Sequence, residues 1–76
     1  MIKKFIVKKV TTIFGSGNSS IDSIMYYDKS SNFDWSRQIV NATKFDSKKE
    51  ALLKLKEKGK SNLKVVYSVD EIYFIN

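Results

Sequence analysis

The stretch that decides the fold is Ala42-Thr43-Lys44-Phe45-Asp46-Ser47-Lys48-Lys49-Glu50-Ala51-Leu52-Leu53-Lys54-Leu55-Lys56-Glu57-Lys58-Gly59. Ser47 followed three residues later by Glu50 is a capping box, which satisfies two backbone N–H groups at a helix start. Gly59 suits the left-handed residue that closes a helix, next to lysines at the negative end of the helix dipole. The stretch therefore predicts a single helix. At this length a helix is marginal by itself, so a sheet must hold it.

The helix is predicted to dock through one narrow stripe. Successive residues turn by about 100°, so Ala51, Leu52 and Leu55 share one face with Gly59, which is typical of a core-facing stripe. Leu53 points roughly the opposite way. It is either a singly exposed leucine, which is common, or part of a partner-binding surface.

Strand patterns surround this helix. Five segments are candidates: Ile2–Phe14, Ile21–Asp28, a short strand within Gln38–Phe45, Leu63–Val69, and Ile72–Ile75, which either continues its predecessor past a bulge at Asp70-Glu71 or turns back as an edge strand. The first has apolar residues on both faces, which indicates a bulge or burial on both sides. Gly15–Ser20 is a turn cluster and Lys29–Asp34 a polar loop.

These elements predict an α+β fold. One domain spans residues 1–76, and a small antiparallel sheet of three to four strands carries one helix on one face, in β-β-α-β order. With only 76 residues, the core lies near the lower size limit for independent folding.

The composition excludes most catalytic chemistry. The chain has no His and no Cys, so it can build no His-dependent triad, Cys nucleophile or His/Cys zinc site. The glycine-rich cluster is followed by a strand pattern rather than by a helix start, which favours a hairpin turn over a phosphate loop. Five carboxylates lie outside the Ala42–Gly59 stretch without metal-ligand spacing: Asp22, Asp28, Asp34, Asp70 and Glu71. We therefore expect no catalytic residue, metal or cofactor, and keep a small metal-dependent enzyme only as a remote alternative.

Compartment follows from the same composition. The absence of cysteine fits the cytoplasm. The amino terminus lacks the long apolar core of a signal peptide, and no apolar run approaches about 18 residues. We expect a cytoplasmic protein without membrane contact.

The charge of +6 is unevenly distributed. Residues 1–14 carry four lysines and no acid, and residues 36–64 carry nine basic and three acidic groups. Residues 15–35 and 65–76 each have a net charge of −2. Basic regions attract nucleic acid or acidic protein surfaces. Arg37 is the one Arg among fourteen basic residues, whereas base-reading and phosphate-binding sites usually use Arg. The lysines are therefore either a binding surface or a solubilising one that reflects AT-rich codons.

Aromatic residues offer a second kind of binding surface. Tyr26 and Tyr27 are adjacent in a predicted strand, so one ring should be in the core and the other exposed. Tyr67 and Tyr73 pose the same question. Exposed strand aromatics beside lysines can stack on bases, but core and cross-strand packing is the favoured interpretation. Trp35 is expected to anchor the core or a sheet edge.

The segment from Trp35 to Ala51 resembles a pattern of small accessory proteins of phages and mobile elements. It has a tryptophan, then an Ala-x-x-Phe step at Ala42–Phe45, then a Ser-x-x-Glu-Ala helix start at Ser47–Ala51. The resemblance implies a strand–strand–helix–strand domain and assigns no catalytic residue. Proteins of this kind include anti-CRISPR and other anti-defence inhibitors, which act by binding.

These observations together predict a non-enzymatic binding protein. The first hypothesis is an inhibitor or modulator of a host nucleic-acid-handling complex, and the alternative is a module that binds nucleic acid directly through lysines and exposed aromatics. The candidate partner-binding residues are Lys49, Leu53, Lys54, Lys56 and Lys58 on the helix, with Tyr26, Lys8 and Lys9 on the strands. A small core and exposed strand edges also allow a homodimer.

Overall fold

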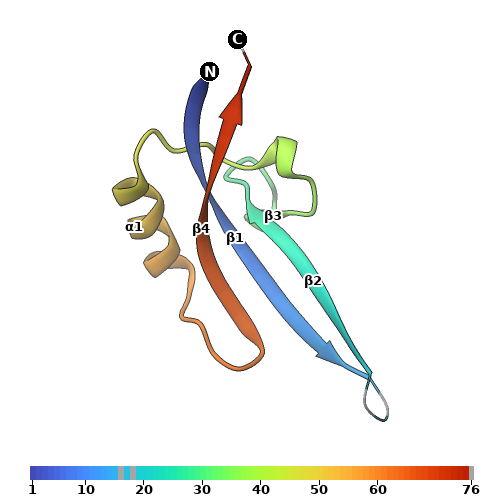
Figure 1. Ribbon diagram of the computed structural model, residues 1–76. Coiled ribbons are helices and arrows are strands. Elements are labelled where there is room, and N and C mark those ends of the chain that lie inside the picture. Colours follow the sequence, from blue (N-terminus) through green and yellow to red (C-terminus); the bar gives the residue numbers. More distant parts are fainter. Residues whose placement is uncertain (16, 18, 76) are drawn as a thin grey trace.

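A computed structural model describes residues 1–15, 17 and 19–75 of the chain. The elements in chain order are β1 (Ile2–Phe14), β2 (Ser20–Tyr27), β3 (Trp35–Ser36), the 3-10 turn η1 (Ile39–Asn41), α1 (Lys48–Lys58) and β4 (Val65–Phe74). In this part of the chain the strands form one antiparallel sheet in the order β3-β2-β1-β4, and α1 lies beside it (Figure 1). The predicted α+β class is confirmed.

Strand β1 organises the sheet. It pairs with β2 from Lys8–Tyr26 to Phe14–Ser20 and with β4 from Ile2–Phe74 to Thr11–Val65. Beyond the end of β2, Phe45 takes the place beside β1. The N–H of Phe45 donates to the Phe5 carbonyl at 2.8 Å, and the N–H of Phe5 donates to the Phe45 carbonyl at 2.9 Å. The chain thus enters α1 directly from the plane of the sheet.

The core lies between the sheet and α1. Its buried members are Phe5, Val7, Tyr27 and Ala51, and the half-buried Trp35, Phe45, Leu55 and Val69 pack against them. Strand alternation puts the odd-numbered residues of β1 on this face. Tyr27 is its aromatic centre: the ring centroids of Trp35, edge-on, and of Phe45, stacked, both lie 6.2 Å away. Of the adjacent tyrosines, Tyr27 is therefore the core residue.

The opposite face of the sheet carries no α-helix in the described structure, and we call it the open face. Its central residue, Ile6, is nevertheless fully buried. Around it lie the even-numbered residues of β1, β2 and β4, of which Ile2, Ile24 and Val66 are 44 to 49% exposed. Of the two alternatives for the first strand, burial on both sides is the correct one, because the pairing with β4 runs from Ile2 to Thr11 without interruption.

Three strand predictions need correction. The last strand does not break at Asp70-Glu71: those residues pair with Ile6 and Phe5 inside β4, and the strand begins only at Val65. The strand expected within Gln38–Phe45 is wrong, because η1 and a single bridge at Phe45 occupy that segment. The second strand starts and ends one residue earlier than predicted.

The turn cluster at Gly15–Ser20 is only partly described, because residues 16 and 18 of it lie outside the described residues. The Gly15 N–H donates to the Ser19 carbonyl at 3.0 Å, which closes the hairpin between β1 and β2. Gly17 has a φ of 73°, a conformation that glycine adopts without strain.

The predicted start of α1 is confirmed, but its predicted buried stripe is wrong in one member. The Ser47 hydroxyl accepts the Glu50 N–H at 3.2 Å. Ala51 is fully buried and Leu55 is half-buried, whereas Leu52 is 39% exposed. The buried side of α1 extends from Leu55 through Ala51 to the aliphatic parts of Lys54 and Lys58, and not to Leu52. The reason is that the rings of Tyr27 and Phe45 lie against the side of the helix that carries Ala51.

Gly59 also differs from expectation. Its φ of 164° and ψ of −179° are extended rather than left-handed. A Cβ at this position would lie 2.7 Å from the Tyr67 ring. Glycine is therefore needed here for space and not for backbone freedom.

Candidate binding surfaces

The outer face of α1 presents two leucines among lysines. Leu52 and Leu53 are 39% and 60% exposed. They line a shallow depression of about 350 Å³ whose other walls are Lys48, Lys49 and Lys56. We call these five residues the α1 outer face. Three of the residues predicted from sequence to bind a partner, Lys49, Leu53 and Lys56, come together here.

The lysines of the α1 outer face are electrostatically unsatisfied within the described structure. None of the three pairs with a carboxylate, although four other lysines of the described chain do. Lysine ammonium groups beside exposed leucines favour a partner surface that combines carboxylates with apolar side chains. An ion pair gains strength where the neighbouring apolar contact excludes water.

Lys54 and Lys58 lie on a different side of α1 and belong to the packing of the helix. Lys54 pairs with Glu57 at 3.0 Å and Lys58 with Asp34 at 2.8 Å. Both ammonium groups lie over the Tyr27 ring, 5.5 and 5.3 Å from its centroid. The hydrogen bonds to Glu57 and Asp34 raise the pKa of Lys54 and Lys58, and that of Glu57 is lowered in turn. These two predicted site residues already have intramolecular partners.

The remaining predicted residues are divided between the two faces of the sheet. Lys8 and Tyr26 are cross-strand neighbours on the open face, and the Lys8 ammonium lies 3.0 Å from Asp70. Lys9 points to the helix side, where its ammonium lies 4.1 Å from the centroid of the Trp35 ring. Partial burial lowers the pKa of Lys9. Tyr26, Lys8 and Lys9 therefore do not form one surface with the α1 outer face.

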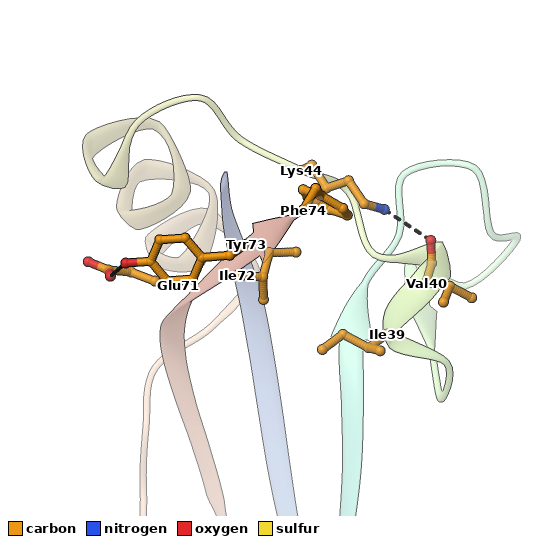
Figure 2. A pocket seen from close by; sticks show the side chains of 7 residues that line it. All are labelled: Ile39, Val40, Lys44, Glu71, Ile72, Tyr73 and Phe74. Atoms are coloured by element: carbon orange, nitrogen blue, oxygen red, sulfur yellow. Dashed lines mark hydrogen bonds between the residues drawn. The ribbon is translucent and has the colours of Figure 1, made fainter. Parts of the chain in front are cut away.

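A second candidate surface is a groove on the open face, which we call the η1–β4 groove. It has a volume of about 560 Å³, and its apolar walls are Ile39 and Val40 of η1 and Ile72 and Phe74 of β4. Figure 2 shows the side chain of Ile39 directed toward β4 and that of Ile72, on the β4 wall, on the side that faces Ile39. A groove of this size and composition can accept an apolar side chain or a second apolar surface.

Lys44 holds one end of this groove in shape. Its ammonium donates to the Val40 carbonyl at 3.0 Å, drawn in Figure 2, and to the Ala42 carbonyl at 2.9 Å. It also lies 5.7 Å from the centroid of the Phe74 ring. These contacts fix the carbonyl end of η1 against β4.

The sequence did not indicate this groove. The sequence pattern predicts a short strand within Gln38–Phe45, which includes Ile39 and Val40, and it indicates Ile72 and Phe74 only as strand residues. The alternation of Ile72 and Phe74 on one face was a usable signal. The position of η1 opposite them was not, because it depends on where Phe45 joins β1.

Among the described residues no three acidic side chains gather as metal ligands would. No helix in this part of the chain is long and apolar enough to cross a membrane. No family model, no curated protein and no solved structure matches the chain. The α1 outer face and the η1–β4 groove are therefore the features that can indicate a function.

Proposed function

We propose that this protein acts by binding another protein through the α1 outer face. The observation that carries the proposal is the exposed pair Leu52 and Leu53 lying among three lysines without acidic partners. The partner's matching surface is acidic and contains apolar side chains.

Charge and chemistry favour a protein over a nucleic acid at this surface. Phosphate backbones are bound by cations and polar groups, and exposed leucines add nothing to that contact. Aliphatic contact surrounded by complementary charge is instead typical of protein interfaces, where the charges speed association and select the partner.

The proposal includes a biological role. We infer that the protein is an inhibitor or modulator, of the phage or mobile-element kind, that occupies a host nucleic-acid-handling complex in the cytoplasm. The resemblance at Trp35–Ala51 supports this role. So does the acidic character that the α1 outer face demands of its partner, because proteins that handle nucleic acid include acidic subunits and acidic catalytic clefts.

The test compares an exposed leucine of the α1 outer face, Leu53, with an exposed leucine outside it, Leu63. Immobilised wild-type protein, Leu53→Asp and Leu63→Asp are each incubated with host-cell lysate, and retained proteins are identified by mass spectrometry. Leu63 is 98% exposed and lies outside the α1 outer face, so it matches Leu53 in chemistry but not in place. We expect one acidic protein to be retained by the wild type and by Leu63→Asp and lost with Leu53→Asp.

The lysines provide an independent arm of the same experiment. Lys56→Glu should weaken retention of that protein. Lys29 is an exposed lysine in the loop after β2, outside the α1 outer face, so Lys29→Glu should leave retention unchanged. Added salt should weaken retention by the wild type, because exposed charge pairs are screened. Equal retention by Leu53→Asp and the wild type, or indifference to both salt and Lys56→Glu, would remove the α1 outer face from the proposal.

A further inference from the structure

The outer edge of β4 is open along half its length. The Thr12 N–H donates to the Lys64 carbonyl at 2.8 Å, which fixes the phase of the β1–β4 ladder. In an antiparallel pair the hydrogen-bonding residues alternate, so the even-numbered residues of β4 bond to β1 and the odd-numbered ones direct their backbone groups outward.

The loop before β4 covers the beginning of this edge. The Asn62 side-chain oxygen accepts the Val65 N–H at 2.9 Å, and the Ser61 hydroxyl accepts the Tyr67 N–H at 2.9 Å. Beyond them, the outward backbone groups of Val69, Glu71 and Tyr73 have no partner in the described part of the chain. No proline or bulge protects this stretch, although such devices commonly protect exposed edges.

We propose that a second copy of this chain pairs with this edge, antiparallel, about a twofold axis at Ile72. Two copies of β4 then join the two sheets into one. All three open residues then have partners in the second copy. Glu71 pairs with Tyr73 of the second copy, Tyr73 pairs with Glu71 of the second copy, and Val69 pairs with Ile75 of the second copy. The pairing is closed, since the same edge is used by both copies.

Charge selects this register over its neighbours. An axis at Asp70 or at Glu71 would place two identical carboxylates directly opposite each other, which is unfavourable. An axis at Tyr73 would place the Glu71 carboxylate opposite the apolar side chain of Ile75. With the axis at Ile72, Glu71 faces a tyrosine, and within one chain the Tyr73 hydroxyl already donates to the Glu71 carboxylate at 3.1 Å.

Packing supports the same register. Ile75 and Tyr73 are 90% and 58% exposed in the single chain, and this pairing covers both. The two Ile72 side chains meet on the open face, so the η1–β4 grooves of the two copies become continuous. The two copies of Val69 lie about 20 Å apart along the strands, which keeps the α1 helices that pack over them from colliding.

The absence of native cysteine allows a direct test of the register. Ile72 sits at a position whose own backbone bonds go to β1, and such non-hydrogen-bonded pairs bring Cα atoms close enough for a disulfide. Under mild oxidation, Ile72→Cys should form a covalent dimer. Asp70→Cys and Phe74→Cys should each crosslink poorly alone and crosslink to each other when mixed. Leu63→Cys is the exposed control.

The oligomeric state of the purified protein provides the second measurement. Sedimentation equilibrium should show a dimer for the wild type. Glu71→Pro removes an outward N–H without touching the β1 ladder, so the chain stays folded by circular dichroism while the dimer Kd rises by roughly tenfold or more. Glu71→Ala keeps the backbone donor and should change Kd by no more than about threefold.

A wild-type monomer at millimolar concentration would overturn the proposal. So would a dimer indifferent to Glu71→Pro, or self-crosslinking strongest at Asp70→Cys or Tyr73→Cys. This test uses the purified protein alone, so it is independent of whether the α1 outer face binds a partner.

Discussion

Gly59 and Ser47 mark the two ends of α1, and each makes a specific contact. Gly59 brings the chain past the Tyr67 ring, which itself packs against Trp35 with 5.9 Å between ring centroids. Ser47 satisfies one backbone donor at the helix start through its hydroxyl. Each contact can be tested by a single substitution.

Gly59→Ala should destabilise the fold by about 1–3 kcal/mol, because the new methyl group collides with a packed aromatic ring. Urea unfolding of the purified protein measures this. Lys60→Ala, one residue further, should change the free energy of unfolding by less than about 0.5 kcal/mol. In a Tyr67→Ala background the cost of Gly59→Ala should nearly vanish; a full cost there would mean that the backbone, not the ring, demands glycine.

Ser47→Ala should cost about 0.5–2 kcal/mol, because the Glu50 N–H loses its acceptor at the helix end. Ser47→Asp should retain most of the stability, since aspartate also caps well and its charge favours the helix N-terminus. Thermal unfolding of the three proteins gives the order. If Asp46→Ala were the costlier change by far, the cap would belong to the neighbouring residue, although Asp46 is here the ion-pair partner of Lys4.

At the scale of the element, α1 packs on the sheet through few apolar side chains, and two lysine side chains add to the contact area. Ala51 and Leu55 touch the core, and Lys54 and Lys58 cover the Tyr27 ring while their charges pair at the surface. Long charged side chains commonly cover apolar surface in this way. The consequence is that the leucine pair on the α1 outer face is free for other use.

Leu55→Ala should therefore destabilise the protein by about 2 kcal/mol, because it opens a gap beside the core. Leu53→Ala is the matched control and should change stability by less than about 0.5 kcal/mol. Chemical denaturation of both variants checks the difference. Equal costs would mean that the assignment of the buried side of α1 is wrong.

The ion pairs of α1 should appear in the pH dependence of stability. The pKa of Glu57 is lowered, chiefly by its hydrogen bond to Lys54, so its contribution is present above its unfolded pKa and is lost as the pH falls through the folded value. We expect the difference in free energy of unfolding between the wild type and Glu57→Gln to shrink below about pH 4. Urea unfolding of both proteins from pH 7 to pH 2 measures it. A difference that grows on acidification would contradict this.

The alkaline limb has the opposite sign. The pKa of Lys58 is raised, chiefly by its hydrogen bond to Asp34, so that contribution is complete below the unfolded pKa of about 10 and is lost as the pH rises through the folded value. The free energy of unfolding of Lys58→Met should therefore differ less from that of the wild type at strongly alkaline pH than at pH 7. Urea unfolding of both proteins at the two pH values measures this difference.

Local signals in the sequence predicted the elements better than their contacts. The bounds of β1 and the cap at Ser47 follow from alternation and from side-chain chemistry within a few residues. The buried side of α1 could not be derived, because it depends on Tyr27, which is far from the helix in sequence, and on the position that Phe45 takes beside β1. The η1–β4 groove escaped prediction for the same reason: the bridge between Phe5 and Phe45 determines where η1 lies.

At the scale of the whole molecule, the described structure has α1 on one face of the sheet only, and apolar surface remains exposed on both sides. The α1 outer face lies on one side, and the η1–β4 groove on the other. If β4 pairs with a second copy, the dimer presents two α1 outer faces on the same side of a continuous sheet. Partner binding and self-association would then use separate surfaces and would not compete.

The distribution of charge over the folded molecule argues against tight binding of free nucleic acid. Lys4, Lys8, Lys54 and Lys58 are paired with carboxylates, and Lys9 lies against the Trp35 ring. Among the lysines that remain, Lys48, Lys49 and Lys56 lie together on the α1 outer face beside exposed leucines, which add nothing to a phosphate contact.

Micromolar protein at low salt should therefore bind generic duplex or single-stranded DNA or RNA weakly, with a shallow dependence of log affinity on log salt. Fluorescence anisotropy with labelled oligonucleotides measures both quantities. Tyr26→Ala is the informative variant, because Tyr26 is the tyrosine beside Lys8 on the open face. Tight binding that falls steeply with salt and requires Tyr26 would move the function from the α1 outer face to the open face of the sheet. Weak binding unaffected by Tyr26→Ala would instead leave the lysines of α1 as determinants of a protein partner.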